Sequence, residues 1–147
     1  MDRHSEKLFE SELLKWIKDK NGNLLALWVS CDFRPETTVF LTPDTFLQQL
    51  GFIFREKGGE IEPHFHMPVT RKLVGTSEFL LLKKGRVSVD FYDDNRAFVA
   101  NTIMEENDLL LIISGGHSFT FLEEGFFIEI KQGPYLGLDE KIRFEKP

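Results

Sequence analysis

The chain has 147 residues, a net charge of −6 and a single cysteine. Its apolar content of 41%, which includes fifteen phenylalanines, is enough to form a core and excludes a disordered chain. The acidic balance argues against nucleic acid and anionic membranes as partners, because both attract Lys and Arg.

The cysteine content and the N-terminus indicate a cytoplasmic location. Cys31 has no second cysteine with which to form an internal disulfide. The sequence shows no signal peptide and no apolar run near the roughly 20 residues that span a bilayer. We therefore expect a protein of the cytoplasm, where thiols stay reduced.

The first part of the chain predicts a hairpin followed by loops and short strands. Leu24–Cys31 is typical of a strand, and the Asn21-Gly22 pair before it is a strong turn signal. We expect an N-terminal hairpin within residues 8–31, with a short helix over Leu8–Lys18 as the alternative. The strands expected next are Thr38–Leu41, Thr45–Glu56 and Ile61–His66.

From residue 78 onwards, apolar strands alternate with turns. The expected strands are Glu78–Lys83, Arg86–Tyr92, Phe98–Met104, Leu109–Ile113, His117–Leu122 and Phe126–Gln132. On the last of these, Phe126, Ile128 and Ile130 are expected to form the packed face. About ten strands without a long helix predict an all-β antiparallel jelly-roll barrel. We expect one domain over residues 1–147, with its core over residues 45–133 and a turn-rich tail over residues 134–147.

Three of the four histidines fall in two short segments. His64 and His66 alternate, so on a strand their side chains would share one face. His117 follows Gly115 and Gly116 in the second segment. Three imidazoles that converge with a carboxylate in a dry cavity would make a transition-metal site.

These two segments resemble the two motifs of the cupin superfamily. The first motif is matched by Gly58, His64, His66, Glu78 and Gly85, with eleven residues between His66 and Glu78, a longer gap than is usual in the family. The second motif is matched by Asn107, Ile113, Gly115 and His117. The stretch over residues 45–133 is also similar to small cupins of bacterial carbohydrate and surface-polysaccharide pathways.

The resemblance implies a fold and a cofactor. The fold is the double-stranded β-helix, or jelly-roll barrel, of the cupins. The cofactor is one divalent transition metal, Fe, Mn, Ni or Zn, bound by His64, His66, Glu78 and His117. Such a ligand set leaves a coordination position open for water or substrate.

Four further residues are candidates for binding a small-molecule substrate. Arg71 lies in the gap after His66 and offers charge-assisted hydrogen bonds to an anionic group. Glu129 and Lys131 share one face of the last strand, and they are acid–base candidates if that face is the interior one. Tyr135 is a candidate cap over the pocket.

Three functions follow from these residues. The first is a metal-binding protein that binds or acts on an unidentified small molecule, of carbohydrate type. The second is a metal-free protein that binds or isomerises a sugar or nucleotide-sugar, with histidine as the general acid or base. The third is a non-enzymatic sensor or assembly module, a homodimer formed through the apolar strand Leu24–Val29. The sequence alone does not decide whether the protein is an enzyme.

Overall fold

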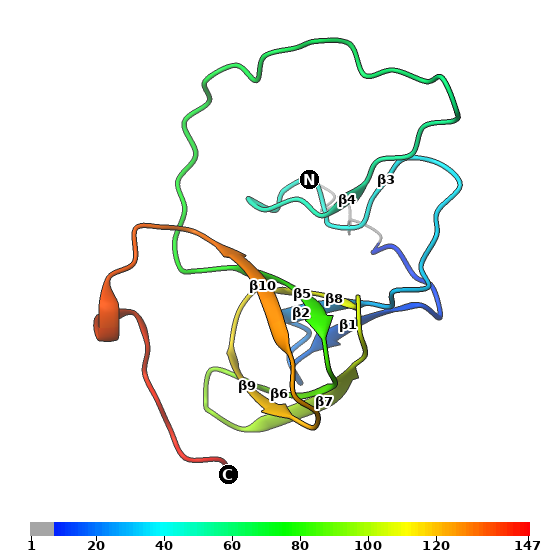
Figure 1. Cartoon of the computed structure of the whole chain (residues 1–147). Coiled ribbons are helices and arrows are strands. Elements are labelled where there is room, and N and C mark those ends of the chain that lie inside the picture. Colours follow the sequence, from blue (N-terminus) through cyan, green and yellow to red (C-terminus); the bar gives the residue numbers. More distant parts are fainter. Residues whose placement is uncertain (1–7) are drawn as a thin grey trace. The chain divides into compact units, whose positions relative to one another are not determined.

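The computed structural model of the chain describes residues 8–147, apart from the side chains of residues 138 and 139 (Figure 1). Two compact units make up this part of the chain. Unit 1 contains residues 8–10 and 34–74, and unit 2 contains residues 11–33 and 75–147. Within the described residues the one helical element is a short 3₁₀ turn, η1 (Gly137–Glu140), so the predicted all-β class is confirmed. The jelly-roll barrel and the single domain stay predictions.

Unit 2 contains two antiparallel sheets. The five-stranded sheet has the order β1-β2-β8-β5-β10, and the three-stranded sheet has the order β7-β6-β9. The strands are β1 (Leu14–Lys18), β2 (Leu24–Val29), β5 (Glu78–Lys84), β6 (Val87–Tyr92), β7 (Phe98–Met104), β8 (Leu109–Ile112), β9 (Gly116–Phe121) and β10 (Phe126–Lys131). From β5 onwards, these bounds differ by at most one residue from those that the sequence predicts.

The N-terminal hairpin is confirmed, and the alternative helix is wrong. β1 pairs with β2, with Leu14 opposite Val29. The Asp19 carboxylate accepts hydrogen bonds from the backbone N–H groups of Asn21 and Asn23, at 2.8 and 2.9 Å. These bonds hold the turn in which Gly22 takes a φ of +83°. β2 lies between β1 and β8, so neither of its edges is open to a second copy of the chain.

Unit 1 contains fewer strand residues than the sequence predicts. Its sheet consists of β3 (Val39–Phe40) and β4 (Gly51–Phe52). The strand expected over Thr45–Glu56 is therefore reduced to two residues. The strand expected over Ile61–His66 is wrong, because residues 53–77 contain no strand. Pro63 cannot donate to a ladder, and this segment pairs with no strand that the structure describes.

The core of unit 2 lies between the facing sides of its two sheets. The five-stranded sheet contributes Ile17, Leu25, Ala26, Leu80, Leu82, Leu110 and Ile112, and the three-stranded sheet contributes Val87, Val89, Phe91 and Met104. All eleven are buried side chains in a single apolar cluster. In the described part of the chain, no helix has the length and apolar character needed to cross a membrane.

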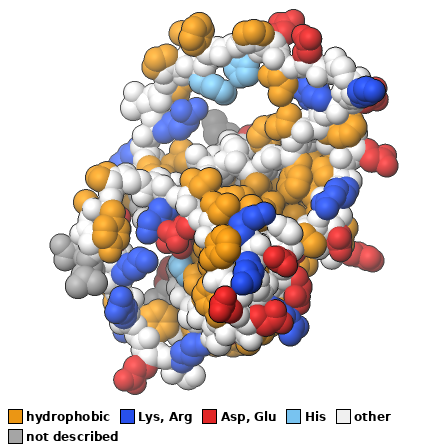
Figure 2. Space-filling view, in the orientation of Figure 1, with side chains coloured by type: hydrophobic (Ala, Val, Ile, Leu, Met, Phe, Trp, Pro, Cys, Tyr) orange, Lys and Arg blue, Asp and Glu red, His pale blue; other side chains and the backbone are white. Residues whose placement is uncertain are grey.

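The packed face of β10 is the opposite of the one that the sequence predicts. Phe127 packs against the core, and its ring lies 5.1 Å from that of Phe119 on β9. Phe126, Ile128 and Ile130 point outwards and are 56%, 46% and 57% exposed. Figure 2 shows hydrophobic side chains at the surface where β10 lies. The pattern misleads because the inner face of β10 ends in Glu129 and Lys131, which lie near a cavity rather than in the core.

Asp108 is a buried carboxylate that joins three segments of unit 2. It is 1% exposed. One carboxylate oxygen accepts a hydrogen bond from the Cys31 backbone N–H at 2.7 Å. The other accepts bonds from the Trp28 indole at 3.0 Å and from the Glu105 backbone N–H at 2.9 Å. Asp108 therefore ties β2 and the turn after it to the turn that precedes β8.

Replacing Asp108 by alanine removes the acceptor for three buried or half-buried donors. We expect the free energy of unfolding to fall by roughly 2–4 kcal/mol, because unsatisfied donors cost their desolvation. Chemical denaturation measured by tryptophan fluorescence checks this. Asp94→Ala, at an exposed turn position, is the control and should change stability by less than about 0.5 kcal/mol. Equal losses in both variants would contradict the structural role of Asp108.

Candidate functional site

A cavity of about 670 Å³ opens at one end of the two sheets of unit 2. The ends of the strands form its floor, with Glu78 from β5, Ile112 from β8, His117 from β9 and Lys131 from β10. The C-terminal residues 140–144 and 146 form one wall. The volume lies within the range of about 300–1,000 Å³ that is usual for small-molecule sites.

Glu78 and His117 contact each other inside this cavity. The distance between His117 Nε2 and Glu78 Oε2 is 3.1 Å, and the two side chains are 25% and 11% exposed. The contact joins the two sheets, since Glu78 begins β5 and His117 lies on β9. Two of the four residues that the sequence predicts as metal ligands are therefore brought together.

The contact with Glu78 determines which ring nitrogen of His117 carries a proton. Nδ1 is buried and has no hydrogen-bond partner among the described residues. Because a carboxylate accepts and cannot donate, Nε2 carries the proton that faces Glu78. Burying a polar atom without a hydrogen-bond partner costs free energy. A native structure that keeps such an atom needs a reason for it, and a role in binding or catalysis is one such reason.

His117 also affects the acidity of Glu78. Its hydrogen bond and its charge lower the pKa of the Glu78 carboxyl below the ordinary value of 4.5, against the opposing effect of burial. Lys131 adds to this lowering and lies directly opposite Glu78 in the β10–β5 register. Glu78 is therefore held as a carboxylate, which is the form that can bind a cation or accept a proton.

Lys131 joins the cavity to Glu129 and Tyr135, two of the other predicted substrate-binding residues. Its ammonium lies 3.2 Å from the Glu129 carboxylate and 5.6 Å from the centre of the Tyr135 ring. Glu129 raises the pKa of Lys131. Tyr135 is 69% exposed and is not among the described residues that line the cavity, and its role as a cap stays a prediction.

The C-terminal wall is a part of the site that sequence reasoning missed. The Phe144 ring packs edge-on against Tyr92, with 5.1 Å between their centres, and the Arg96 guanidinium lies 5.8 Å from it. Lys146 forms a 2.8 Å ion pair with Asp90. These contacts place the cations Lys141 and Arg143 along the cavity. The one local sequence signal for this placement is that the two cations are two residues apart in an otherwise acidic chain.

The remaining predicted residues lie in unit 1. His64 and His66 are both exposed, and their ring centres are 5.1 Å apart. His64 Nδ1 lies 2.8 Å from the Glu62 carbonyl oxygen. Arg71 is exposed in the same strand-free segment. Within their units, the histidines therefore form one close pair, and Glu78 with His117 forms another.

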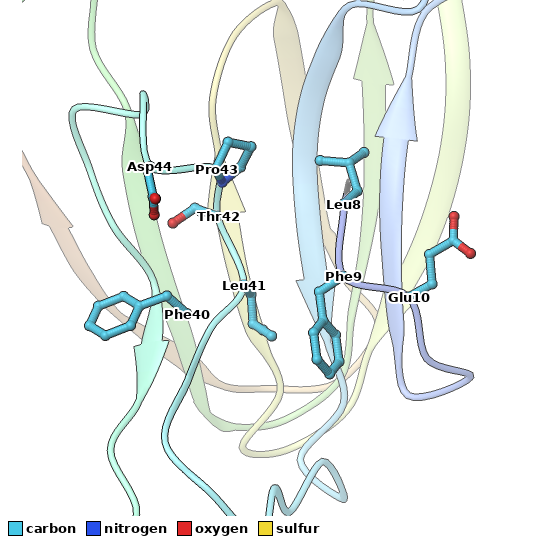
Figure 3. Close-up of a pocket in the computed structure, with 8 residues that line it drawn as sticks. All are labelled: Leu8, Phe9, Glu10, Phe40, Leu41, Thr42, Pro43 and Asp44. Atoms are coloured by element: carbon cyan, nitrogen blue, oxygen red, sulfur yellow. The ribbon is translucent and has the colours of Figure 1, made fainter. Parts of the chain in front are cut away.

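Unit 1 has a cavity of its own, of about 620 Å³ (Figure 3). Leu8, Phe9 and Glu10 line one side, and residues 40–44 line the other. The titratable groups of this lining are the carboxyls of Glu10 and Asp44. The described residues of this lining include no histidine and no pair of opposite charges, so the cavity of unit 2 is the stronger candidate.

Glu78 and His117 have the spacing that two ligands of the metal implied by the family resemblance would need. The 3.1 Å between His117 Nε2 and Glu78 Oε2 matches the spacing of about 3.0–3.4 Å between neighbouring ligand atoms on one transition-metal ion. Over the residues that the structure describes, no three His, Cys, Asp or Glu side chains gather in one metal-binding group. The pair Glu78–His117 thus fits a metal that would replace the proton on Nε2, since ligand atoms must be deprotonated. The four-ligand set stays a prediction.

Changing pH should reveal the contact between Glu78 and His117. Because folding lowers the pKa of Glu78, its contribution to stability is complete above about pH 4.5 and is lost as pH falls through the lowered pKa. Glu78→Gln should therefore be less stable than the native chain near neutral pH, and the gap should close in acid. Denaturation curves at a series of pH values measure this.

Glu106→Gln, at an exposed turn position, is the matched control. Its free energy of unfolding should change with pH in the same way as that of the native chain. A Glu78→Gln curve that is also parallel would show that folding leaves this carboxyl unperturbed.

Comparison with known proteins finds no matching family model, no matching curated protein and no matching solved structure.

Proposed function

We propose that this protein binds a small anionic molecule in the cavity of unit 2, with Glu78 and His117 at the polar centre of the site. The observation that supports this proposal is the charge of the side chains that line the cavity. Among the lining side chains that the structure describes, four are cationic (Lys131, Lys141, Arg143 and Lys146) and two are acidic (Glu78 and Glu140), in a chain whose net charge is −6. A cavity of the opposite charge to its protein concentrates anions.

Two of these cations are available to a ligand. Lys131 is paired with Glu129 and Lys146 with Asp90. Lys141 and Arg143 have no ion pair or hydrogen bond among the residues that the structure describes, and both line the cavity. An Arg guanidinium binds carboxylate or phosphate through two parallel hydrogen bonds, which favours an anionic ligand over a neutral one.

The apolar part of the lining suits the remainder of such a ligand. Ile112, Phe119, Ile142 and Phe144 supply apolar surface, and the Tyr92 hydroxyl lies 3.2 Å from the Ser118 hydroxyl. A mostly apolar lining with a few converging polar groups is the usual composition of a small-molecule site. The proposal therefore concerns a small organic anion and not a bare inorganic ion.

An acid–base reaction receives less support from this geometry than binding does. Nε2 of His117 faces Glu78, and Nδ1 is buried, so neither ring nitrogen presents a lone pair to the cavity. Glu78 is the better placed base, since its Oε1 oxygen has no hydrogen bond or ion pair with the residues that the structure describes. The isomerase alternative and the sensor alternative stay predictions, as does the cytoplasmic location.

The anion proposal is tested by thermal unfolding with added ligands. Citrate and glucose 6-phosphate are the probes, and glucose and sodium chloride of equal ionic strength are the comparison solutes. A ligand that binds only the folded chain stabilises it by about 2.7 kcal/mol at one hundred times its Kd. We expect at least one of the two anions to raise the melting temperature and glucose to leave it unchanged.

The double variant Lys141→Gln with Arg143→Gln should lose that rise. The double variant Lys18→Gln with Lys20→Gln removes two exposed cations outside the cavity and should keep it. The proposal is wrong if neither anion stabilises the native chain beyond sodium chloride, or if the cavity variant keeps the full effect.

We further propose that the site holds one divalent transition metal, as the family resemblance implies. The 3.1 Å contact between Glu78 and His117 and the close pair formed by His64 and His66 support this. When bound, the metal would supply a Lewis acid next to the anion. Elemental analysis of untagged protein, after incubation with Fe(II), Mn(II), Ni(II) or Zn(II), should find about one equivalent of metal.

Alanine variants of the four predicted ligands separate the possible outcomes. Loss of the metal in all four variants would support one shared site. Loss in His64→Ala and His66→Ala alone would place the metal on the histidine pair and leave Glu78 and His117 to the anion. Less than about a tenth of an equivalent in the native chain, for every metal, would reject the cofactor.

A further inference from the structure

The outer edge of β10 is an open sheet edge. β10 ends the five-stranded sheet, and among the described strands it pairs with β5 alone. On its other side, no backbone hydrogen bond is made to any part of the chain that the structure describes. A row of unpaired N–H and C=O groups on a six-residue strand is a template for another strand.

The side chains of β10 favour a partner rather than water. Phe126, Ile128 and Ile130 form an apolar stripe on its outer face, and each is about half exposed. The stripe continues onto β5, where Ile128 lies opposite Leu81 and Ile130 opposite Phe79. Edge strands usually avoid association through proline or outward charges, and this stripe contains neither.

The inner face of β10 determines which strand can pair. Glu129 and Lys131 lie there, with the side chain of Glu129 41% exposed, and they would oppose most incoming strands with an unmatched charge. A second copy of β10 is different, because it supplies both charges. In an antiparallel pair, directly opposed residues lie on the same face, so a two-fold axis passes through one residue.

Only some registers of such a pair are compatible with these charges. An axis at Glu129 would set Glu129 against itself, which is repulsive. An axis at Ile130 sets Glu129 opposite Lys131 of the second copy, and Lys131 opposite its Glu129. That register also brings the two Ile130 side chains into contact on the outer face. The register pairs residues 129–131 with the same residues of the second copy. It sets Ile128 opposite Gln132, so within the stripe Ile130 is the residue that meets its counterpart.

We propose that two copies of this chain associate through antiparallel pairing of β10 with β10, about a two-fold axis at Ile130. The pairing joins two five-stranded sheets edge to edge into one continuous sheet. It is held by backbone hydrogen bonds, by contact between the two Ile130 side chains and by two Glu129–Lys131 pairs across the seam. The surface differs from the strand Leu24–Val29 that the sequence suggests, since β2 is an inner strand.

Sedimentation equilibrium at low ionic strength tests the proposal with a charge swap. In Glu129→Lys, positions 129 and 131 are both cationic, and in Lys131→Glu both are acidic. Each variant alone should raise the dimer dissociation constant by roughly tenfold or more, because like charges then face each other across the seam. An equimolar mixture of the two should form a heterodimer, because the charges are again opposite.

If Glu129 and Lys131 only stabilised the fold of their own chain, mixing the two variants would not restore association. Ile130→Lys should be monomeric at every concentration at which the native chain is a dimer. Ile61→Lys is its matched control, since Ile61 is 54% exposed in a strand-free segment and Ile130 is 57% exposed. Circular dichroism confirms that each variant is folded. A native chain that sediments as a monomer, or a mixture no more associated than its components, overturns the proposal.

Discussion

The two antiparallel sheets of unit 2 contact each other through their apolar sides, and this contact determines where polar side chains can lie. Leu80, Leu110 and Val89 are among the side chains buried there, and each large side chain contributes about 1.5–3 kcal/mol when fully removed from water. Alternation along each strand makes this face continuous. On β5 and β9 the charged and imidazole side chains of that face lie near the strand ends, where the two sheets no longer cover each other.

The cavity lies where this apolar series stops. Along β5 the inner residues run from Leu82 through Leu80 to Glu78, and along β10 they run from Phe127 to Lys131. On β9, His117 lies next to Phe119, with 5.4 Å between their rings. The same periodicity that builds the core thus delivers a carboxylate, an ammonium and an imidazole to one end, each on a rigid strand and partly shielded from water. Such partial burial makes their mutual interactions stronger than on an open surface.

Local pattern was sufficient for the strands from residue 78 onwards, because alternation with Gly and Asx turns is a short-range property. It failed for the segment with His64 and His66, whose alternation also suits a strand but which has no ladder partner in the described chain. It failed for the face of β10, since Phe126, Ile128 and Ile130 are more apolar than the inner residues. The contribution of Lys141 and Arg143 depends on Phe144 packing against Tyr92, a long-range contact that no local signal encodes.

β10 connects the two proposals physically. Its inner face gives Lys131 to the cavity, and its edge is the surface proposed for a second copy. Lys131 is paired with Glu129 of its own chain at 3.2 Å, and pairing across the seam would exchange that partner for one in the other copy. The position of the Lys131 ammonium relative to Glu78 then depends on association. Since an equilibrium coupling between two sites acts equally in both directions, a ligand that binds Lys131 would in turn change the affinity between the two copies.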